Sequence, residues 1–496
     1  MLLLGFDIGS SSIKAALVDA ATGKTLGTAH HPDREMDITA PQPDWAEQAP
    51  ADWWEATCAA TRKLLEKTRA APADIAAIGI SYQMHGLVVV DKSGEVLRPS
   101  IIWCDSRAVS IGNKAFNYLG ENYCLAHYLN SPGNFTASKL RWVRENEPGL
   151  FSKIDKMMLP GDYLAYRMTG EIRTSVTGLS EGVLWDFKEN TVAKRLLEHY
   201  EIPERMLPDV APGFSIQGKM TAQAAAALGL APGIPVGYRA GDQPNNALSL
   251  NVLRPGEVAA TGGTSGVVYA IAARPTFDPQ QRVNSFAHVN HTPENPLTGI
   301  LLCINGAGSQ YRWMRQHLGA PGLSYDDMEQ LAASAGIGAD GVSILPFGNG
   351  AERMLGNRVV GSRIAGLNFN RHEKHHLYRA ALEGIAFSFV YGMEAMRDMG
   401  IPLKVIRAGN DNLFQSAIFS NTIATLVGAE IELIATTGAV GAAKAAGVSV
   451  GIYKSVEEAM ASVEVAGKYE LGGEKEAMEE AYWRWKKELE LIISHS

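Results

Sequence analysis

The chain has 496 residues, which is too long for one hydrophobic core, because single cores stop growing near roughly 250–300 residues. Hydrophobic residues make up 46% and charged residues 20%, a mixture that excludes a disordered or fibrous protein. The formal net charge of −8 argues against a nucleic-acid partner, which needs clustered lysine and arginine. We therefore predict two globular domains that bind no nucleic acid.

Cysteine usage and hydropathy indicate the compartment. The 4 cysteines are scattered without the Cys-x-x-Cys spacing of a zinc or redox site. No uninterrupted apolar run approaches the ~20 residues that span a bilayer. The apolar start of the chain is also too short for a signal peptide. We expect a cytoplasmic protein with no membrane partner.

The first half opens with a predicted β-hairpin. Residues 2–6 are apolar and lead into Asp7, and a turn over Gly9–Ser12 separates them from a second apolar run, Ile13–Val18. Helical spacing follows over residues 44–68. Buried strands are then predicted within residues 74–86 and within residues 101–108, each followed by a polar loop.

The same layout returns near residue 240. Residues 234–250 are typical of a strand, a polar Gly-Asp turn and the start of a helix, and residues 257–272 of a second hairpin with a Gly-rich turn. We therefore expect the second half to repeat the architecture of the first, with domains at 1–248 and 249–496. Strands that alternate with helices indicate a layered α/β fold in each half.

Two turns, one in each half, have the composition of phosphate-binding loops. Glycine lets backbone N–H groups converge on an anion, and the hydroxyl side chains add further donors. The first turn supplies Gly9, Ser10, Ser11 and Ser12, with Lys14 just beyond, and the second supplies Gly262, Gly263, Thr264 and Ser265. Either turn alone is equally well explained as an ordinary hairpin turn. The pair, in equivalent places, favours a nucleotide held from both sides.

Two carboxylates belong to the same hypothesis. Asp7 is placed to hold Mg²⁺ beside a polyphosphate, directly or through water. Asp242 ends a predicted strand within Ala240-Gly241-Asp242-Gln243 and could accept a proton from a substrate hydroxyl. The alternative for Asp242 is an N-cap for the helix that starts near Pro244, the commoner role for an isolated aspartate.

These motifs together resemble the FGGY family of carbohydrate kinases. The resemblance rests on DIGSSSIKAAL, AGDQ and TGGTSG in this order, on Thr136–Trp142, and on the stretch from Ser362 to Glu383. It implies an actin-like ATPase fold, in which two ribonuclease-H-like domains flank a central cleft. It also implies ATP and Mg²⁺ as ligands, Asp242 as catalytic base and Asp7 as the magnesium-linked carboxylate. Adenosine would lie against Gly409, Asn410 and Asn412, where this chain departs from the family's usual Gly-Gly-Gly run.

The expected substrate depends on a shorter stretch. Gln83-Met84-His85-Gly86 resembles the sugar-contacting segment of the family's xylulose-phosphorylating branch. The predicted sugar-binding residues are Met84, His85, Trp103, Asp105, Asp242 and Gln243. Gln243 stands where many members of that branch have Asn, and Ala351-Glu352-Arg353 replaces their Gly-Glu-Arg. A core histidine that merely ends a strand is the alternative for His85.

The resemblance therefore implies transfer of the γ-phosphate of ATP to the 5-hydroxyl of D-xylulose. A kinase of the same family that acts on ribulose, another ketose or a sugar alcohol is the nearest alternative. A non-catalytic sugar sensor or a chaperone-like ATPase of the same fold is a more distant one. The small-molecule sugar and ATP are the expected partners, and the sequence leaves open whether the chain forms a homodimer.

Overall fold

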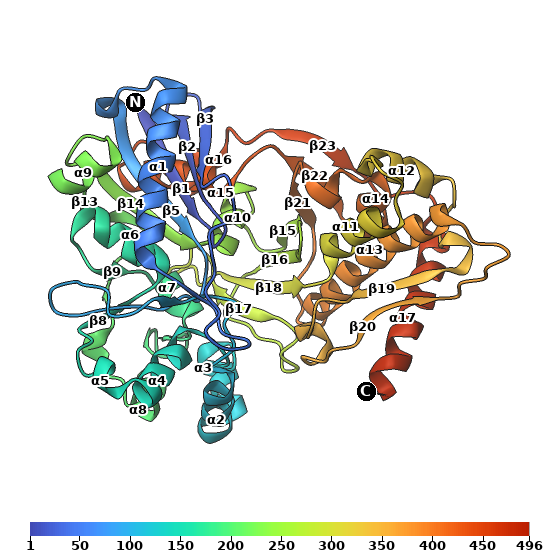
Figure 1. Ribbon diagram of the computed structural model, residues 1–496, viewed down its shortest axis with the longest axis horizontal. Helices are drawn as coiled ribbons and strands as arrows, with labels where there is room; N and C mark the ends of the chain where they lie inside the picture. Colours follow the sequence, from blue (N-terminus) through green and yellow to red (C-terminus); the bar gives the residue numbers. More distant parts are fainter. Residues whose placement is uncertain (496) are drawn as a thin grey trace.

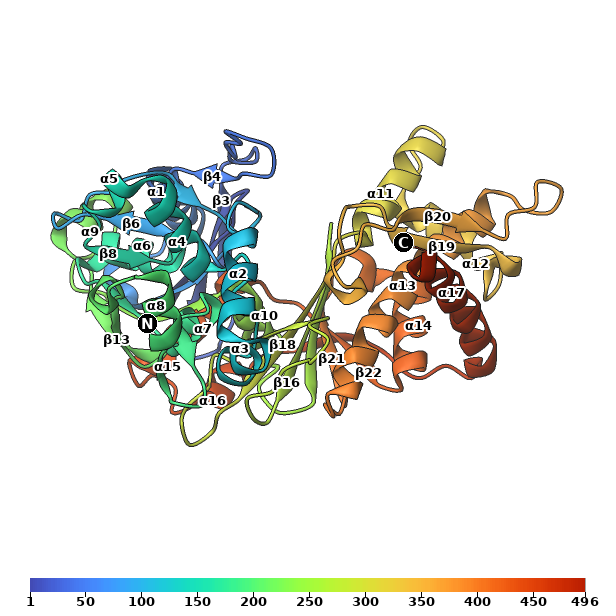
Figure 2. The ribbon, with the colours of Figure 1, turned by 90° about the horizontal axis from the view of Figure 1, so that it is seen from below.

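The computed structural model describes residues 1–495 and divides the chain into two lobes that lie side by side (Figure 1). The N-terminal lobe, blue to green, is built around one mixed sheet, and the C-terminal lobe, yellow to red, around another. Viewed from below, β16 and β18 lie between the two helical layers (Figure 2). The prediction of two α/β domains is confirmed.

The sheet of the N-terminal lobe begins with the predicted hairpin, in which β1 pairs antiparallel with β2 and Asp7 lies opposite Lys14. On its other side β1 is parallel to β5, which is in turn parallel to β14. In spatial order the strands are β13 (Phe214–Lys219), β14 (Pro235–Gly241), β5 (Ile75–Tyr82), β1 (Leu2–Ile8), β2 (Ile13–Asp19) and β3 (Thr25–His31).

The sheet of the C-terminal lobe repeats this arrangement. Its hairpin β15–β16 is antiparallel, β15 is parallel to β21, and β21 is parallel to β22. The spatial order is β17 (Asn284–Ala287), β18 (Thr298–Ile304), β16 (Gly266–Ala272), β15 (Glu257–Gly262), β21 (Val405–Gly409), β22 (Glu430–Ile434) and β23 (Val465–Tyr469). The order β3-β2-β1-β5-β14 therefore matches β18-β16-β15-β21-β22, and the predicted repeat of architecture is confirmed.

Helices cover the sheets on both faces. Those of the N-terminal lobe are α1 (Pro50–Thr68), α2 (Val109–Leu119), α3 (Glu121–Tyr128), α4 (Thr136–Asn146), α5 (Pro148–Phe151), α6 (Pro160–Thr169), α7 (Val176–Glu181), α8 (Lys194–Tyr200), α9 (Ala222–Leu228), α10 (Asp242–Ser249), α15 (Gly438–Ser449) and α16 (Val456–Met460). Those of the C-terminal lobe are α11 (Ala307–Leu318), α12 (Tyr325–Ala333), α13 (Lys374–Asp398), α14 (Ala417–Val427) and α17 (Lys475–His495).

Shorter elements fix the loops. Paired short strands are β4 (Glu47–Gln48) with β7 (Ser100–Ile101), β6 (Val88–Val90) with β8 (Lys156–Met158), β9 (Arg173–Thr174) with β12 (Asp209–Val210), β10 (Trp185–Asp186) with β11 (Thr191–Val192), and β19 (Ser343–Phe347) with β20 (Gly361–Ala365). Single 3₁₀ turns are η1 (Pro72–Asp74), η2 (Glu204–Met206), η3 (Ala339–Gly341), η4 (Arg353–Leu355) and η5 (Asn412–Gln415). The strand expected within 101–108 is thus mostly loop.

The two lobes share a hydrophobic core. Along β16, Val268 faces the core under α13, whereas its neighbours Tyr269 and Ile271 pack among the helices of the N-terminal lobe. Successive side chains of a strand point to opposite faces, so one sheet is buried on both sides. Phe286 of β17 joins the same shared cluster, and the lobes are therefore joined by apolar packing.

Helix α15 comes from the second half of the sequence but packs on the sheet of the N-terminal lobe. Glycines on three strands make the close approach sterically feasible. A Cβ atom on Gly5 would lie 1.9 Å from the carbonyl oxygen of Ala439, and one on Gly79 would lie 1.9 Å from that of Ala442. A Cβ on Gly237 would likewise lie 1.7 Å from Ser449 Oγ. The predicted division after residue 248 thus describes the order along the chain but not where α15 packs.

None of the helices described within residues 1–495 combines the length and the apolar character needed to cross a membrane.

Candidate active site

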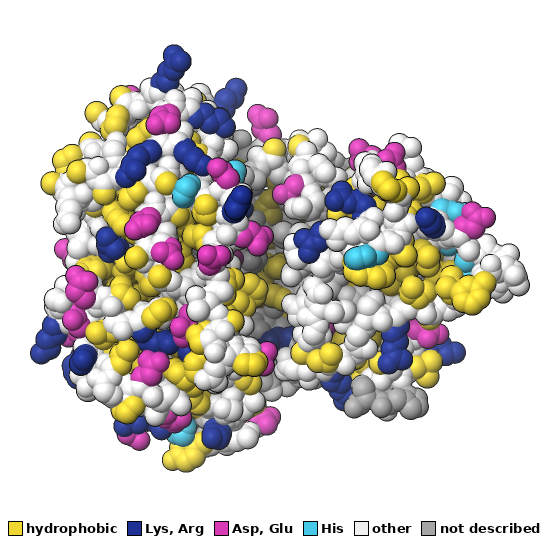
Figure 3. Space-filling model, in the orientation of Figure 1, with side chains coloured by type: hydrophobic (Ala, Val, Ile, Leu, Met, Phe, Trp, Pro, Cys, Tyr) yellow, Lys and Arg dark blue, Asp and Glu magenta, His cyan; other side chains and the backbone are white. Residues whose placement is uncertain are grey.

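The predicted catalytic residues come together where three parallel strands end. Asp7 lies near the end of β1, Met84 and His85 follow β5, and Asp242 follows β14. Parallel neighbours end at the same edge of a sheet, and Ser81 of β5 lies opposite both Asp7 and Ala240. On the surface, a hollow separates the two lobes (Figure 3).

Asp242 is the first residue of α10, and Gly241 occupies the N-cap position, so the capping alternative does not describe this aspartate. The Asp242 side chain is half-buried. Burial, and to a smaller extent the charge of Asp7, raise the pKa of its carboxyl to about 7. A carboxyl with a pKa near neutrality is suited to general-base chemistry.

The glycine of the AGDQ motif has a packing role. A Cβ atom on Gly241 would lie 2.5 Å from Met84 Cγ and 2.7 Å from Glu181 Oε2. Glu181, the last residue of α7, is fully buried, and burial raises the pKa of its carboxyl well above its usual range. A hydrogen bond with the Tyr82 side chain lowers the pKa of Glu181, whereas the charge of Asp242 raises it. Only glycine at position 241 lets Met84 and Glu181 pack directly against the base of the Asp242 helix.

His85 is held in a defined orientation. Its φ of 62° places it in the left-handed region, and its Nδ1 lies 2.8 Å from the carbonyl oxygen of Glu181. Burial, and then the charge of Lys139, lowers the pKa of the imidazole to about 3, so the ring is neutral. Because a carbonyl can only accept, Nδ1 carries the proton and Nε2 is left as an acceptor. His85 also packs edge-on against Phe135.

Lys139 ties the predicted sugar-binding loops together. Its side chain is completely buried, and its Nζ donates to the carbonyl oxygens of His85 and Ile102, each at 2.9 Å. Burial lowers the pKa of this lysine to about 7. A buried cation with two carbonyl partners fixes the loop after β5 relative to the loop that carries Trp103.

Two of the predicted sugar contacts differ in their surroundings. Trp103 is 53% exposed, and its Nε1 lies 3.4 Å from Ser10 Oγ of the first turn. Asp105 is fully buried, and its carboxylate accepts from the Ala46 amide and from the backbone and guanidinium of Arg107. Its oxygens are thus used within the protein. The sugar contact of Asp105 stays a prediction, which would require its carboxylate to accept a further donor besides Ala46 and Arg107.

The first turn closes as predicted, since the Gly9 amide donates to the Ser12 carbonyl at 3.1 Å. Ser81 Oγ donates to Asp7 Oδ1 at 2.9 Å, and Lys14 is exposed beside the turn. Gly438, at the start of α15, lies on the other side of Asp7. The N-terminus of that helix, where backbone N–H groups lack intrahelical partners, therefore faces the same region.

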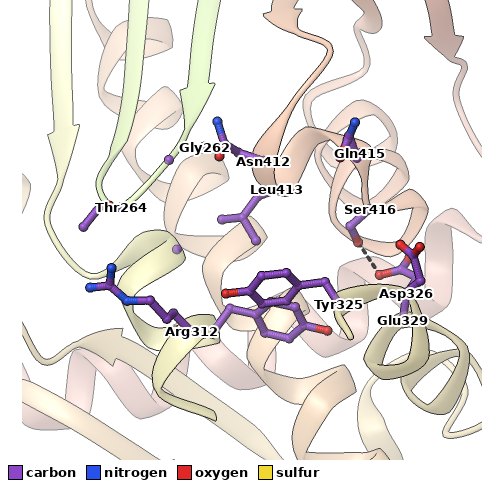
Figure 4. A pocket seen from close by; sticks show the side chains of 13 residues that line it. Gly262, Thr264, Arg312, Tyr325, Asp326, Glu329, Asn412, Leu413, Gln415 and Ser416 are labelled. Atoms are coloured by element: carbon purple, nitrogen blue, oxygen red, sulfur yellow. Dashed lines mark hydrogen bonds between the residues drawn. The ribbon is translucent and has the colours of Figure 1, made fainter. Parts of the chain in front are cut away.

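The second turn forms one wall of a pocket of about 440 Å³ in the C-terminal lobe (Figure 4). Gly308 and Ser309, at the start of α11, donate to the carbonyl oxygens of Gly263 and Thr264 at 3.0 Å each. The lining residues are Gly262, Gly263, Thr264, Gly308, Tyr311, Arg312, Tyr325, Asp326, Glu329, Asn412, Leu413, Gln415 and Ser416.

The pocket has one aromatic and one polar side (Figure 4). Tyr311 and Tyr325 stack with ring centroids 5.6 Å apart, and Leu413 adds an apolar surface. Ser416 Oγ donates to Glu329 Oε2 at 2.6 Å at the far end. This combination suits a flat, partly polar ligand such as a nucleobase.

Four of the predicted nucleotide residues line this pocket, namely Gly262, Gly263, Thr264 and Asn412. Ser265, Gly409 and Asn410 are not among the lining residues. The contributions of α11 and α12 to this pocket were not predicted, because neither helix carries a Gly-rich motif. Lys139 was not assigned a role either, although it lies within the stretch Thr136–Trp142 that carries the family resemblance.

Two family models match the chain: the N-terminal domain of the FGGY family of carbohydrate kinases over residues 2–249, and the C-terminal domain over residues 258–450. The chain is 29% identical to the xylulose kinase of Escherichia coli strain K12 over 465 residues, which cover 92% of each protein. It is 28% identical to a xylulose kinase of Staphylococcus epidermidis over 494 residues, covering 97% of this chain and 95% of that protein. The solved structure of the xylulose kinase from Rhodospirillum rubrum matches with a TM-score of 0.88 at 27% identity, covering 99% of both chains.

The two-lobed fold and these matches define a phosphotransferase that uses an alcohol group as acceptor. The chain belongs to the FGGY family of carbohydrate kinases. It is a sugar kinase.

Proposed function

We propose that this chain acts in the cytoplasm and transfers the γ-phosphate of ATP to the 5-hydroxyl of D-xylulose, giving D-xylulose 5-phosphate and ADP. The observation that carries the proposal is the position of Asp242 at the strand edge, beside Asp7 and the Met84-His85 loop. The names of the relatives from E. coli, S. epidermidis and R. rubrum support xylulose as the acceptor.

Asp242 is proposed to act as the general base. A carboxyl with a pKa of about 7 is partly ionised at neutral pH and still basic enough to accept the proton of a sugar hydroxyl. Gln243, at the same helix start, hydrogen-bonds Asp242 and thereby favours its charged form. Proton removal at the hydroxyl oxygen makes that oxygen the nucleophile.

ATP is proposed to lie with adenosine in the pocket beside Tyr311 and Leu413 and with its phosphates between the two turns. This placement is supported by the backbone hydrogen bond that joins α11 to the turn at Gly262–Ser265, in which the Gly308 amide donates to the Gly263 carbonyl. The turn at Gly9–Ser12 provides amides and hydroxyls from the opposite lobe.

The residues present fit a magnesium ion at Asp7. Its carboxylate has one hydroxyl donor, Ser81, and its charge acts on Asp242, so the site concentrates negative charge and oxygen donors. Asp7 would hold Mg²⁺ directly or through water. Mg²⁺ bound there would neutralise charge on the ATP phosphates.

The sugar is proposed to lie against Met84, His85 and Trp103. The neutral His85 ring presents Nε2 as an acceptor for a sugar hydroxyl, because Nδ1 is engaged by Glu181. The exposed Trp103 ring offers an apolar face to the sugar carbons. A site of this kind rejects a sugar that leaves His85 unpaired.

A panel of acceptors in an ADP-release assay tests the proposal. Purified protein is given ATP and Mg²⁺ with D-xylulose, ribulose, other ketoses, glycerol or a sugar alcohol. The highest kcat/KM is expected with D-xylulose. A much higher value with ribulose or glycerol would transfer the assignment to that substrate, and binding of a sugar without turnover would indicate a sensor.

A further inference from the structure

Arg353 of the C-terminal lobe lies near the loop after β5 that carries Met84 and His85, here called the sugar loop. Arg353 begins η4, which contacts β18, and its charge contributes to the low pKa of His85 after burial and Lys139. Burial raises the pKa of the thiol of Cys303, near the end of β18, to about 11. The charge of Arg353 lowers that pKa and the charge of Asp242 raises it, so both groups are close to Cys303. These groups therefore gather where the two lobes face each other.

Arg353 has no anionic partner within residues 1–495. Its Nη1 donates only to the carbonyl oxygen of Gln281, at a long 3.4 Å. Burial lowers the pKa of the guanidinium. Arg379, a buried arginine of the same lobe, is by contrast paired with Glu383 at 2.6 Å. An enclosed cation without a counter-charge is costly, so this position is built for an anion that the folded chain does not itself supply.

The neighbouring residue explains how Arg353 is held in place. Glu352 is completely buried, and its Oε1 accepts from the Asn305 amide at 2.9 Å. Asn305 Nδ2 in turn donates to the Ala351 carbonyl at 2.8 Å. The Asn305 turn leads into α11, whose Gly308 braces the second phosphate turn through Gly263. One short segment thus positions both the phosphate turn and Arg353.

We propose that Arg353 binds the phosphoryl group while it passes from ATP to the sugar, and is a catalytic residue contributed by the C-terminal lobe. This inference rests on the proposed function. Asp242 takes the hydroxyl proton, the hydroxyl oxygen bonds to the γ-phosphorus, and the bond from that phosphorus to the β,γ-bridging oxygen breaks to release ADP. The guanidinium N–H groups donate to the non-bridging oxygens, where charge is concentrated during transfer.

The test compares Arg353→Ala and Arg353→Lys with Arg363→Ala, an exposed arginine of the same lobe that serves as the control. We expect Arg353→Ala to lower kcat by roughly 10²–10³-fold, as for loss of one transition-state donor, with the KM for sugar changed by less than about 3-fold. Added guanidinium ion is expected to restore part of kcat in Arg353→Ala and none in Asp242→Asn. Arg353→Lys should recover only part of the loss, because an ammonium cannot donate in the bidentate geometry.

A second measurement does not depend on the sugar. With ADP and Mg²⁺ present, the affinity for inorganic phosphate is expected to fall more than about 10-fold in Arg353→Ala and to stay unchanged in Arg363→Ala. An unchanged kcat, absence of guanidinium rescue, or unaltered phosphate affinity would overturn the assignment of Arg353. If the wild type phosphorylates no sugar, the proposed function fails, and phosphate affinity alone decides the role of Arg353.

Discussion

Gly438 at the start of α15 lies directly against the carboxylate of Asp7, such that a Cβ atom at position 438 would be 3.0 Å from Asp7 Cγ. Asn245 Nδ2 of α10 donates to the Gly438 carbonyl at 2.9 Å and holds this contact in place. The carboxylate nearest the chain start is therefore positioned by a helix from the last quarter of the sequence.

The close packing of α15 predicts a stability effect at Gly79. Gly79→Ala places a Cβ atom 1.9 Å from the Ala442 carbonyl oxygen, so α15 must shift away from the sheet. We expect a loss of about 1–3 kcal/mol or more in the free energy of unfolding, measured by urea denaturation. Gly149→Ala is the control, because a Cβ atom there meets nothing within 4 Å. Equal stabilities of the two variants would contradict the described packing.

The assignment of Asp242 predicts a separation of binding from turnover. Asp242→Asn keeps the shape of the side chain but cannot accept a proton, so kcat should fall roughly 10²–10⁴-fold. Sugar affinity, measured by calorimetry, should change only a few-fold. Asp209→Asn, at an exposed position of the same lobe, should leave turnover intact. Full activity of Asp242→Asn would remove this residue from the mechanism.

The raised pKa of Asp242 predicts an acid limb in the pH profile. A general base must be ionised, so kcat/KM should rise with pH through about 7, the pKa of the Asp242 carboxyl. The measurement is the initial rate at low sugar concentration across the neutral range. A profile that is flat through this range would show that no group with this pKa controls the reaction.

The free energy of unfolding should fall as pH rises through about 7, whereas kcat/KM should rise. The folded protein holds the Asp242 proton up to the carboxyl pKa of about 7, whereas the ordinary pKa of 3.8 applies in the unfolded chain. This contribution to the free energy of unfolding is complete below the lower value and is lost as pH rises through the higher one. Asp242→Asn should therefore gain melting temperature relative to the wild type at about pH 8 but not at about pH 4. An equal difference at both pH values would contradict the raised pKa.

Lys139 should influence the sugar more than the nucleotide. Lys139→Met removes the lysine donor to the carbonyl oxygens of His85 and Ile102. The Ile102 carbonyl keeps the Asp105 amide as a donor at 3.2 Å, whereas the loss at the His85 carbonyl should cost about 1–3 kcal/mol. We expect a higher KM for sugar and an almost unchanged KM for ATP in steady-state kinetics. Lys153→Met, at an exposed position of the same lobe, is the control. A selective rise in the KM for ATP would show that Lys139 does not act through the sugar loop.

Local patterns were sufficient to predict the two hairpins and their turns, because a turn between alternating apolar runs is determined by adjacent residues. Asp7, the Met84-His85 pair and Asp242 could be grouped because each follows a strand, and parallel strands end at one edge. The family resemblance supplied the fold and the reaction class.

Contacts between distant segments were not predictable in the same way. The sequence around Asp105 does not reveal that Ala46 and Arg107 occupy its carboxylate. The stacked Tyr311 and Tyr325 belong to two ordinary amphipathic helices, and only their packing makes a pocket wall. Arg353 likewise becomes notable only when the structure of residues 1–495 shows it without an ion pair.

The packing of α15 also has a consequence for biosynthesis. A ribosome delivers the strands β1, β5 and β14 long before residues 438–449, yet one face of those strands is covered by that helix. The first lobe therefore keeps an uncovered apolar surface until residues 438–449 have emerged. Nascent chains that stall before this point are the species that chaperones would be expected to retain.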